Sequence, residues 1–77
     1  MVGEFSVLLT FPALSLLLQA ERLVVEAGVR YRIQPIPSHL KAGCGMCMAL
    51  WPGDAERVTI LLQGEDIAHS LQSLQTE

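Results

Sequence analysis

The chain has 77 residues, of which 51% are apolar and only 5% aromatic, and its net charge at pH 7 is −3. A chain of this length forms one domain with a small core, which buries about 60% of the unfolded surface. Residues 1–50 contain four basic and three acidic side chains, whereas residues 51–77 contain one basic and five acidic ones. Neither half can neutralise the several phosphates of a nucleic-acid site, so we expect no nucleic-acid partner.

Residues 6–20 contain no charged side chain and could be mistaken for a membrane segment. The segment is shorter than the roughly 20 residues that span a bilayer, and Pro12 interrupts it. A signal peptide needs a basic start, whereas the charged side chain that precedes this segment is Glu4. We therefore expect a cytoplasmic protein without a membrane span, in which the cysteines are thiols and form no structural disulfide.

The first half of the chain predicts a strand followed by a helix. Residues 5–11 form an apolar run that Pro12 ends, which is typical of a buried strand. Apolar residues then recur at steps of three and four, the pattern of an amphipathic helix that ends at Gly28. The members of this stripe are Ala13, Leu16, Leu17, Ala20, Leu23, Val24 and Ala27.

The same helix carries a second apolar line, formed by Leu14, Leu18 and Val25. One interpretation is a helix that is buried deeply between sheet and loops. The other is a surface that contacts a partner or a second copy of the chain, and the high apolar content makes a homodimer a reasonable expectation.

The middle of the chain predicts two further strands. Residues 29–35 alternate between apolar and polar side chains, as in a half-buried strand. Pro35 and Pro37 cannot donate to a sheet ladder, so this strand should lie at an edge or end there. Residues 36–45 then form a loop, and residues 46–51 are apolar enough for a third strand.

A second helix should follow the turn Pro52-Gly53-Asp54, with Asp54 as its N-cap and Gly64 at its end. The core face of this helix is given by Ala55, Val58, Leu61 and Leu62. The spacing of Ile67, Leu71 and Leu74 fits a short C-terminal helix, and a loosely attached tail over residues 65–77 is the alternative.

The predicted order is β-α-β-β-α within a single domain, residues 1–77. This order gives an α/β fold of the α+β two-layer sandwich type, with both helices on one face of the sheet. It is close to half of a ferredoxin-like motif, with the cysteine loop between the second and third strands.

The chemistry is concentrated in Cys44-Gly45-Met46-Cys47, a C-x-x-C motif. Gly43 and Gly45 flank Cys44 and let the backbone approach another molecule, and Lys41 favours the reactive thiolate. We expect Cys44 on an exposed turn. No acid–base pair, phosphate loop or nucleophile triad accompanies the motif, so we expect neither a complete enzyme nor a cofactor.

Three other interpretations of the cysteines compete with a reactive thiol. Both can be small buried hydrophobic residues, and Cys47, inside an apolar strand, suits this role. A zinc site with His39 as a third ligand is incomplete, because one C-x-x-C supplies half of a structural site. A thioredoxin-like dithiol needs the motif at the start of a helix, whereas here it leads into a strand.

Several segments resemble the small selenium/sulfur (Se/S) carrier protein-like domains of bacteria. They are Ala20-Glu21-Arg22-Leu23, Glu26-Ala27-Gly28-Val29, Arg32, Pro35-Ile36-Pro37, Gly43-Cys44-Gly45-Met46 and Ala49-Leu50. The resemblance implies that Cys44 is the carrier thiol, which holds sulfur as a persulfide or selenium as a selenosulfide. A donor such as a cysteine desulfurase would load it and an acceptor protein would unload it, while Cys47 would resolve the persulfide or fill the sheet.

The chain departs from this family at two places. The family often has small polar residues with a histidine after the first strand, where this chain has Ala13-Leu14-Ser15, and an arginine at the position of Ser38. Two other hypotheses, based on the second apolar line of the first helix and on the two thiols, stand beside the carrier. One is a non-catalytic dimerising module with structural cysteines, and the other is a metal-binding module that uses Cys44 and Cys47.

Overall fold

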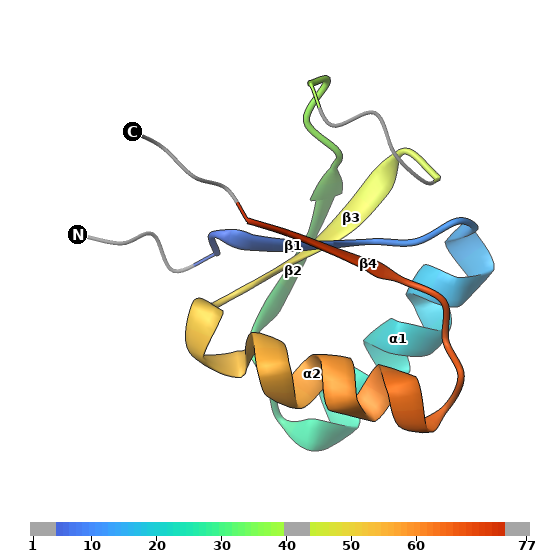
Figure 1. The fold of residues 1–77 in the computed structure, drawn as a ribbon, viewed down its shortest axis with the longest axis vertical. Helices are drawn as coiled ribbons and strands as arrows, with labels where there is room; N and C mark the ends of the chain where they lie inside the picture. Colours follow the sequence, from blue (N-terminus) through green and yellow to red (C-terminus); the bar gives the residue numbers. More distant parts are fainter. Residues whose placement is uncertain (1–4, 40–43, 74–77) are drawn as a thin grey trace.

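The computed structural model describes residues 5–39 and 44–73. Its elements are β1 (Val7–Thr10), α1 (Leu14–Ala27), β2 (Tyr31–Pro35), β3 (Met46–Leu50), α2 (Pro52–Gly64) and β4 (Ser70–Ser73). The sheet has the order β2-β3-β1-β4, and every neighbouring pair is antiparallel. Both helices pack on one face of this sheet (Figure 1). The fold is α+β, as predicted, and β4 completes the β-α-β-β-α-β arrangement of ferredoxin-like domains.

The two central strands are buried on both faces. In β3 the residues from Cys47 to Leu50 are fully buried, and in β1 Leu8 and Leu9 are also fully buried. A strand covered on both faces has no polar side to alternate with, which explains the continuous apolar sequence of both strands. The prediction that the second strand lies at an edge or ends at its prolines is confirmed, because β2 is an outermost strand of the sheet that the described residues form, and it ends at Pro35.

Helix α1 follows its predicted stripe. Leu17, Ala20 and Val24 are buried against the sheet. Gly28 has φ of +73°, and its N–H bonds to carbonyls of the last turn, so it ends the helix in the left-handed conformation. The second apolar line points away from this core, since Leu14, Leu18 and Val25 are each more than half exposed. The interpretation of a deeply buried helix is therefore wrong.

Helix α2 begins three residues earlier than predicted. Trp51 is its N-cap and Pro52 its first residue, whereas Asp54 lies within the first turn. Proline suits this position, because its fixed φ matches the helix and the N–H that it lacks would have had no partner. Asp54 still stabilises the helix, because a carboxylate in the first turn interacts favourably with the helix dipole.

The C-terminal segment contains a strand, and the prediction of a short helix there is wrong. Ile67 is buried, with its N–H bonded to the carbonyl of Leu62, and β4 then pairs with β1. The strand forms because β1 would otherwise present unpaired backbone groups at a sheet edge. This tertiary pairing outweighs the helical spacing of Ile67 and Leu71. Leu74 lies outside the described residues.

The sheet has a second, smaller core on the face without helices. Leu8, Cys47 and Ala49 form it, with Phe5 and Ile36 packed against them. Arginine side chains lie on the surrounding aromatic rings, with the Arg30 guanidinium 3.7 Å from the centre of the Trp51 ring and that of Arg32 4.7 Å from the centre of Phe5. Such cation–π contacts let a charged side chain cover an apolar surface while its polar edge stays in water. These contacts border the face on which Cys47 lies.

Candidate functional site

Cys44 is held where β1 ends and α1 begins. Its backbone N–H donates to the carbonyl of Phe11 over 2.9 Å, three residues before the first residue of α1. On the other side of the loop, the N–H of Ile36 donates to the carbonyl of Gly45 over 3.0 Å. These two hydrogen bonds fix the approach to β3 at the end of the sheet where α1 starts (Figure 1).

The Cys44 side chain is half-buried, with part of its surface accessible to solvent. It packs against the core on the helix side of the sheet, and its Sγ lies 3.6 Å from the carbonyl oxygen of Met46. We expected an exposed turn; Cys44 does lie in a turn, but its packing against the core covers part of the thiol. The thiol therefore keeps part of its surface accessible while the core covers the rest.

Gly45 gives this turn its shape. Its φ is +91°, a conformation that residues with a side chain rarely adopt, and nothing lies within 4 Å of the position a Cβ would take. Glycine is therefore required by the backbone and not by the packing around it. Lys41 and Gly43, the other predicted supporting residues, lie outside the described residues.

Cys47 has a different environment. It is fully buried, and its Sγ lies 3.9 Å from the carbonyl oxygen of Pro35. Burial raises the pKa of the Cys47 thiol, because a thiolate would lose its hydration, and the nearby Cys44 raises it further. Cys47 is therefore held as a neutral thiol, which is poorly nucleophilic.

The two cysteines do not share a face of the sheet. Cys47 lies within β3, where alternation places its side chain on the face without helices, whereas Cys44 lies in the turn before the strand. Cys44 packs against the helix-side core and Cys47 belongs to the small core on the other face, and both are free thiols. In this conformation the C-x-x-C motif is not a preformed dithiol, because the side chains of a bridged pair must point toward each other.

The described residues also bring no third metal ligand to these thiols. Within residues 5–39 and 44–73, no group of three His, Cys, Asp or Glu side chains lies close enough to hold an ion. His39, the ligand suggested by sequence, is exposed, and His69 Nδ1 lies 2.7 Å from the carbonyl oxygen of Ile67.

The amino end of α1 is a feature of the site that sequence reasoning missed. Its N-cap, Ala13, has no side chain that could accept a hydrogen bond from the first turn, and the first turn contains no acidic residue. The first N–H groups of a helix lack intrahelical partners and form the positive end of its dipole, which favours an anion nearby. The sequence signal was the break Phe11-Pro12-Ala13, but only the hydrogen bond from Cys44 to Phe11 connects it with the thiol.

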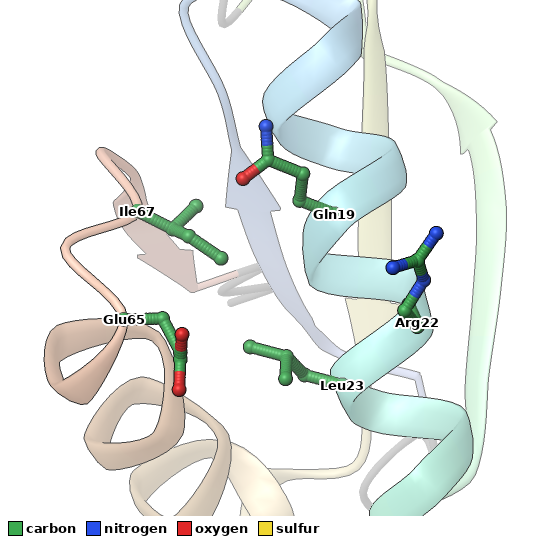
Figure 2. Close-up of a pocket in the computed structure, with 5 residues that line it drawn as sticks. All are labelled: Gln19, Arg22, Leu23, Glu65 and Ile67. Atoms are coloured by element: carbon green, nitrogen blue, oxygen red, sulfur yellow. The ribbon is translucent and has the colours of Figure 1, made fainter.

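A pocket of about 150 Å³ lies elsewhere, between α1 and the turn that follows α2. Figure 2 shows that the side chains of Leu23 and Ile67 point toward one another across it, with Glu65 on the α2 side. Gln19 and Arg22 complete its lining, and neither cysteine contributes to it. The pocket is thus separate from the thiols.

In the part of the chain that the structure describes, no helix has the length and apolar character needed to cross a bilayer.

Comparisons with known proteins support the carrier family. No curated protein and no solved structure matches the chain. A family comparison, however, matches residues 6–70 to the family described as "Putative Se/S carrier protein-like". Because the match covers most of the 77 residues, including both cysteines and the start of α1, the chain belongs to this Se/S carrier protein-like family.

Proposed function

We propose that the protein carries sulfur or selenium on Cys44, as a persulfide or a selenosulfide, between two partner proteins. The observation that supports this most is the contrast in burial, since Cys44 has an accessible surface whereas Cys47 is fully buried. Membership of the Se/S carrier protein-like family supports sulfur or selenium as the atom that this thiol carries. On this proposal the protein is a carrier and not an enzyme.

Loading is an exchange between sulfur atoms. The Cys44 thiolate attacks the terminal sulfur of a persulfide on a donor protein, for which a cysteine desulfurase is suited. A new S–S bond forms on Cys44, the S–S bond of the donor breaks, and the donor cysteine leaves as a thiolate. Selenium is transferred in the same way from a donor selenosulfide. In unloading, an acceptor nucleophile attacks the terminal atom and the Cys44 thiolate leaves, so no oxidant or reductant is consumed.

The start of α1 suits this exchange. A thiolate and a persulfide anion both carry negative charge, and the uncapped first turn of α1 offers the positive end of a helix dipole beside the Cys44 backbone. We propose that Lys41 adds to this effect and that Gly43 and Gly45, which flank Cys44, let the backbone approach a partner closely. For Cys47 we propose a packing role, because a buried neutral thiol does not attack a persulfide.

The test is intact mass spectrometry of the unreduced protein after incubation with a low-molecular-weight persulfide. We expect a gain of one sulfur atom that is mapped to Cys44, is removed by reductant and is absent from Cys44→Ser. The matched control is Cys47→Ser, which should load as the wild type does. A sulfur atom found on Cys47, or loading that persists in Cys44→Ser, would overturn the proposal.

A further inference from the structure

One side of α1 exposes a line of apolar residues toward the edge of the sheet. Leu14, Leu18 and Val25 are 51%, 53% and 57% exposed. Because successive residues turn by about 100°, these three lie within a narrow arc of the helix surface, and Glu21 lies in the same arc. The Tyr31 hydroxyl, on β2, donates to Glu21 Oε2 over 2.7 Å. This arc, which we term the α1 flank, therefore faces the edge strand β2.

The α1 flank begins close to the backbone of Cys44 in the chain's packing. Leu14 is the first residue of α1, and the Cys44 N–H is bonded to Phe11 just before it. On the same side of the sheet, Ile33 and Met46 are only partly buried. Partly exposed apolar side chains thus extend from the edge strand and from α1 to Cys44, and a molecule seated on the α1 flank would lie beside the accessible thiol.

The size of the α1 flank fits a short-lived contact better than a permanent one. A half-exposed leucine or valine offers less than roughly 100 Å² of apolar surface. Three such side chains together offer at most roughly 300 Å², which is less than the apolar part, somewhat more than half, of the approximately 800 Å² per partner that a stable interface buries. A carrier must release its donor after loading, so a small apolar surface beside the thiol suits its task, whereas a permanent dimer through this surface lacks sufficient area.

The two sides of α1 also differ in charge. The side that faces α2 contains Gln19 and Arg22 and lines a pocket together with Glu65 (Figure 2). On the α1 flank the charged side chain is Glu21, and its carboxylate already accepts the hydrogen bond from Tyr31. A partner that binds this side would therefore contact aliphatic side chains, which favour a partner with an apolar surface of its own.

We propose that the α1 flank is the docking surface for a protein persulfide donor. An apolar surface of the donor packs on the flank and thereby places the terminal sulfur of the donor next to Cys44. This inference rests on the proposed function, since it names the partner of the same thiol. A low-molecular-weight persulfide does not need the docking surface, whereas a protein donor does. The two kinds of donor therefore separate docking on the α1 flank from the chemistry of Cys44.

The experiment measures the rate at which Cys44 gains sulfur from each kind of donor. The protein donor is a cysteine desulfurase in its persulfide form, at a concentration below saturation, and the small donor is glutathione persulfide. The variant Leu14→Gln/Leu18→Gln removes the apolar surface next to the thiol, and Val25→Gln changes its far end. The matched control is Ile60→Gln on α2, because Ile60 is 60% exposed and lies outside the α1 flank.

For the double variant we expect the rate of loading from the desulfurase to fall roughly tenfold. A few apolar residues contribute most of the binding energy of an interface, so replacing two of them should weaken donor binding by about this factor. Val25→Gln should lose less, Ile60→Gln nothing, and all variants should load from glutathione persulfide at the wild-type rate. If the double variant and the wild type load at the same rate from the desulfurase, the proposal of a docking surface is wrong, whereas the proposed function of Cys44 is unaffected. Failure of wild-type Cys44 to load from either donor would overturn the proposed function as well.

The oligomeric state provides a second check. Sedimentation of the wild-type protein and of the double variant should show a monomer in both cases. A wild-type dimer that the double variant abolishes would identify a second copy as the occupant of the α1 flank and would overturn the proposal of a donor.

Discussion

Cys44 and Cys47 are three residues apart, yet the fold gives them opposite environments. Cys44 is half-buried beside the start of a helix, whereas Cys47 is fully buried beneath the other face of the sheet. The difference arises because β3 begins at Met46, so Cys44 lies in the turn before the strand whereas Cys47 lies within the strand and points to the face without helices. Two cysteines with a familiar spacing need not act together, and the element they enter decides whether they do.

The largest expected difference between the two thiols is in alkylation. In the native protein, we expect iodoacetamide to modify Cys44 at least roughly 100-fold faster than Cys47, because Cys47 must wait for local opening of the sheet. Mass spectrometry of timed samples measures both rates, and the two should converge in denaturant. Similar rates in native protein would mean that the two environments are not distinct.

Replacing each cysteine by serine should lower the stability of the protein to different extents. Cys47→Ser should lower the free energy of unfolding by about 1–3 kcal/mol, because it buries a hydroxyl without a good partner. The Sγ is already 3.9 Å from the Pro35 carbonyl, and the shorter C–O bond of serine does not close that gap. Cys44→Ser should change stability by no more than about 0.5 kcal/mol. Urea unfolding measures both, and an equal loss would contradict the contrast in burial.

The turn between the thiols gives a third prediction. Gly45→Ala should cost about 1–2 kcal/mol, because alanine is strained at φ of +91° although space for its methyl group exists. Gly64→Ala is the matched control, since it adds a methyl group into open space at the last residue of α2 without a positive φ, and it should be neutral or slightly stabilising. Both are measured by urea unfolding, and the variant that loses stability should also load sulfur more slowly.

The smallest expected effect is in the pH dependence of stability. Burial raises the pKa of Cys47 above its ordinary value of 9.0, so the unfolded chain releases this proton at a lower pH than the folded one. The folded state then binds more protons, and stability falls as pH rises above about 9, by at most about 1.4 kcal/mol for each pH unit. Below that pH the contribution is fully present. Cys47→Ala should reduce this loss, and an unchanged slope would show that Cys47 does not cause it.

Elements whose pattern is local could be predicted from the sequence without the structure. The apolar stripe and Gly28 gave α1, the alternation gave β2, and the apolar run gave β3, because helix and strand periods are properties of a few neighbouring residues. The sequence also selected Cys44 as the thiol to consider, through its glycines, and the family, through the segments around it.

Tertiary structure decided what depends on residues far apart in the chain. It turned the segment from Ser70 to Ser73 into β4, because β1 had a free edge to pair with. It moved Cys47 to the opposite face from Cys44, exposed Leu14, Leu18 and Val25, and placed Cys44 beside Phe11 and the start of α1. These features follow from strand pairing and from the packing of a helix on one face of a sheet, which no local pattern encodes, because each needs a partner segment from another part of the chain.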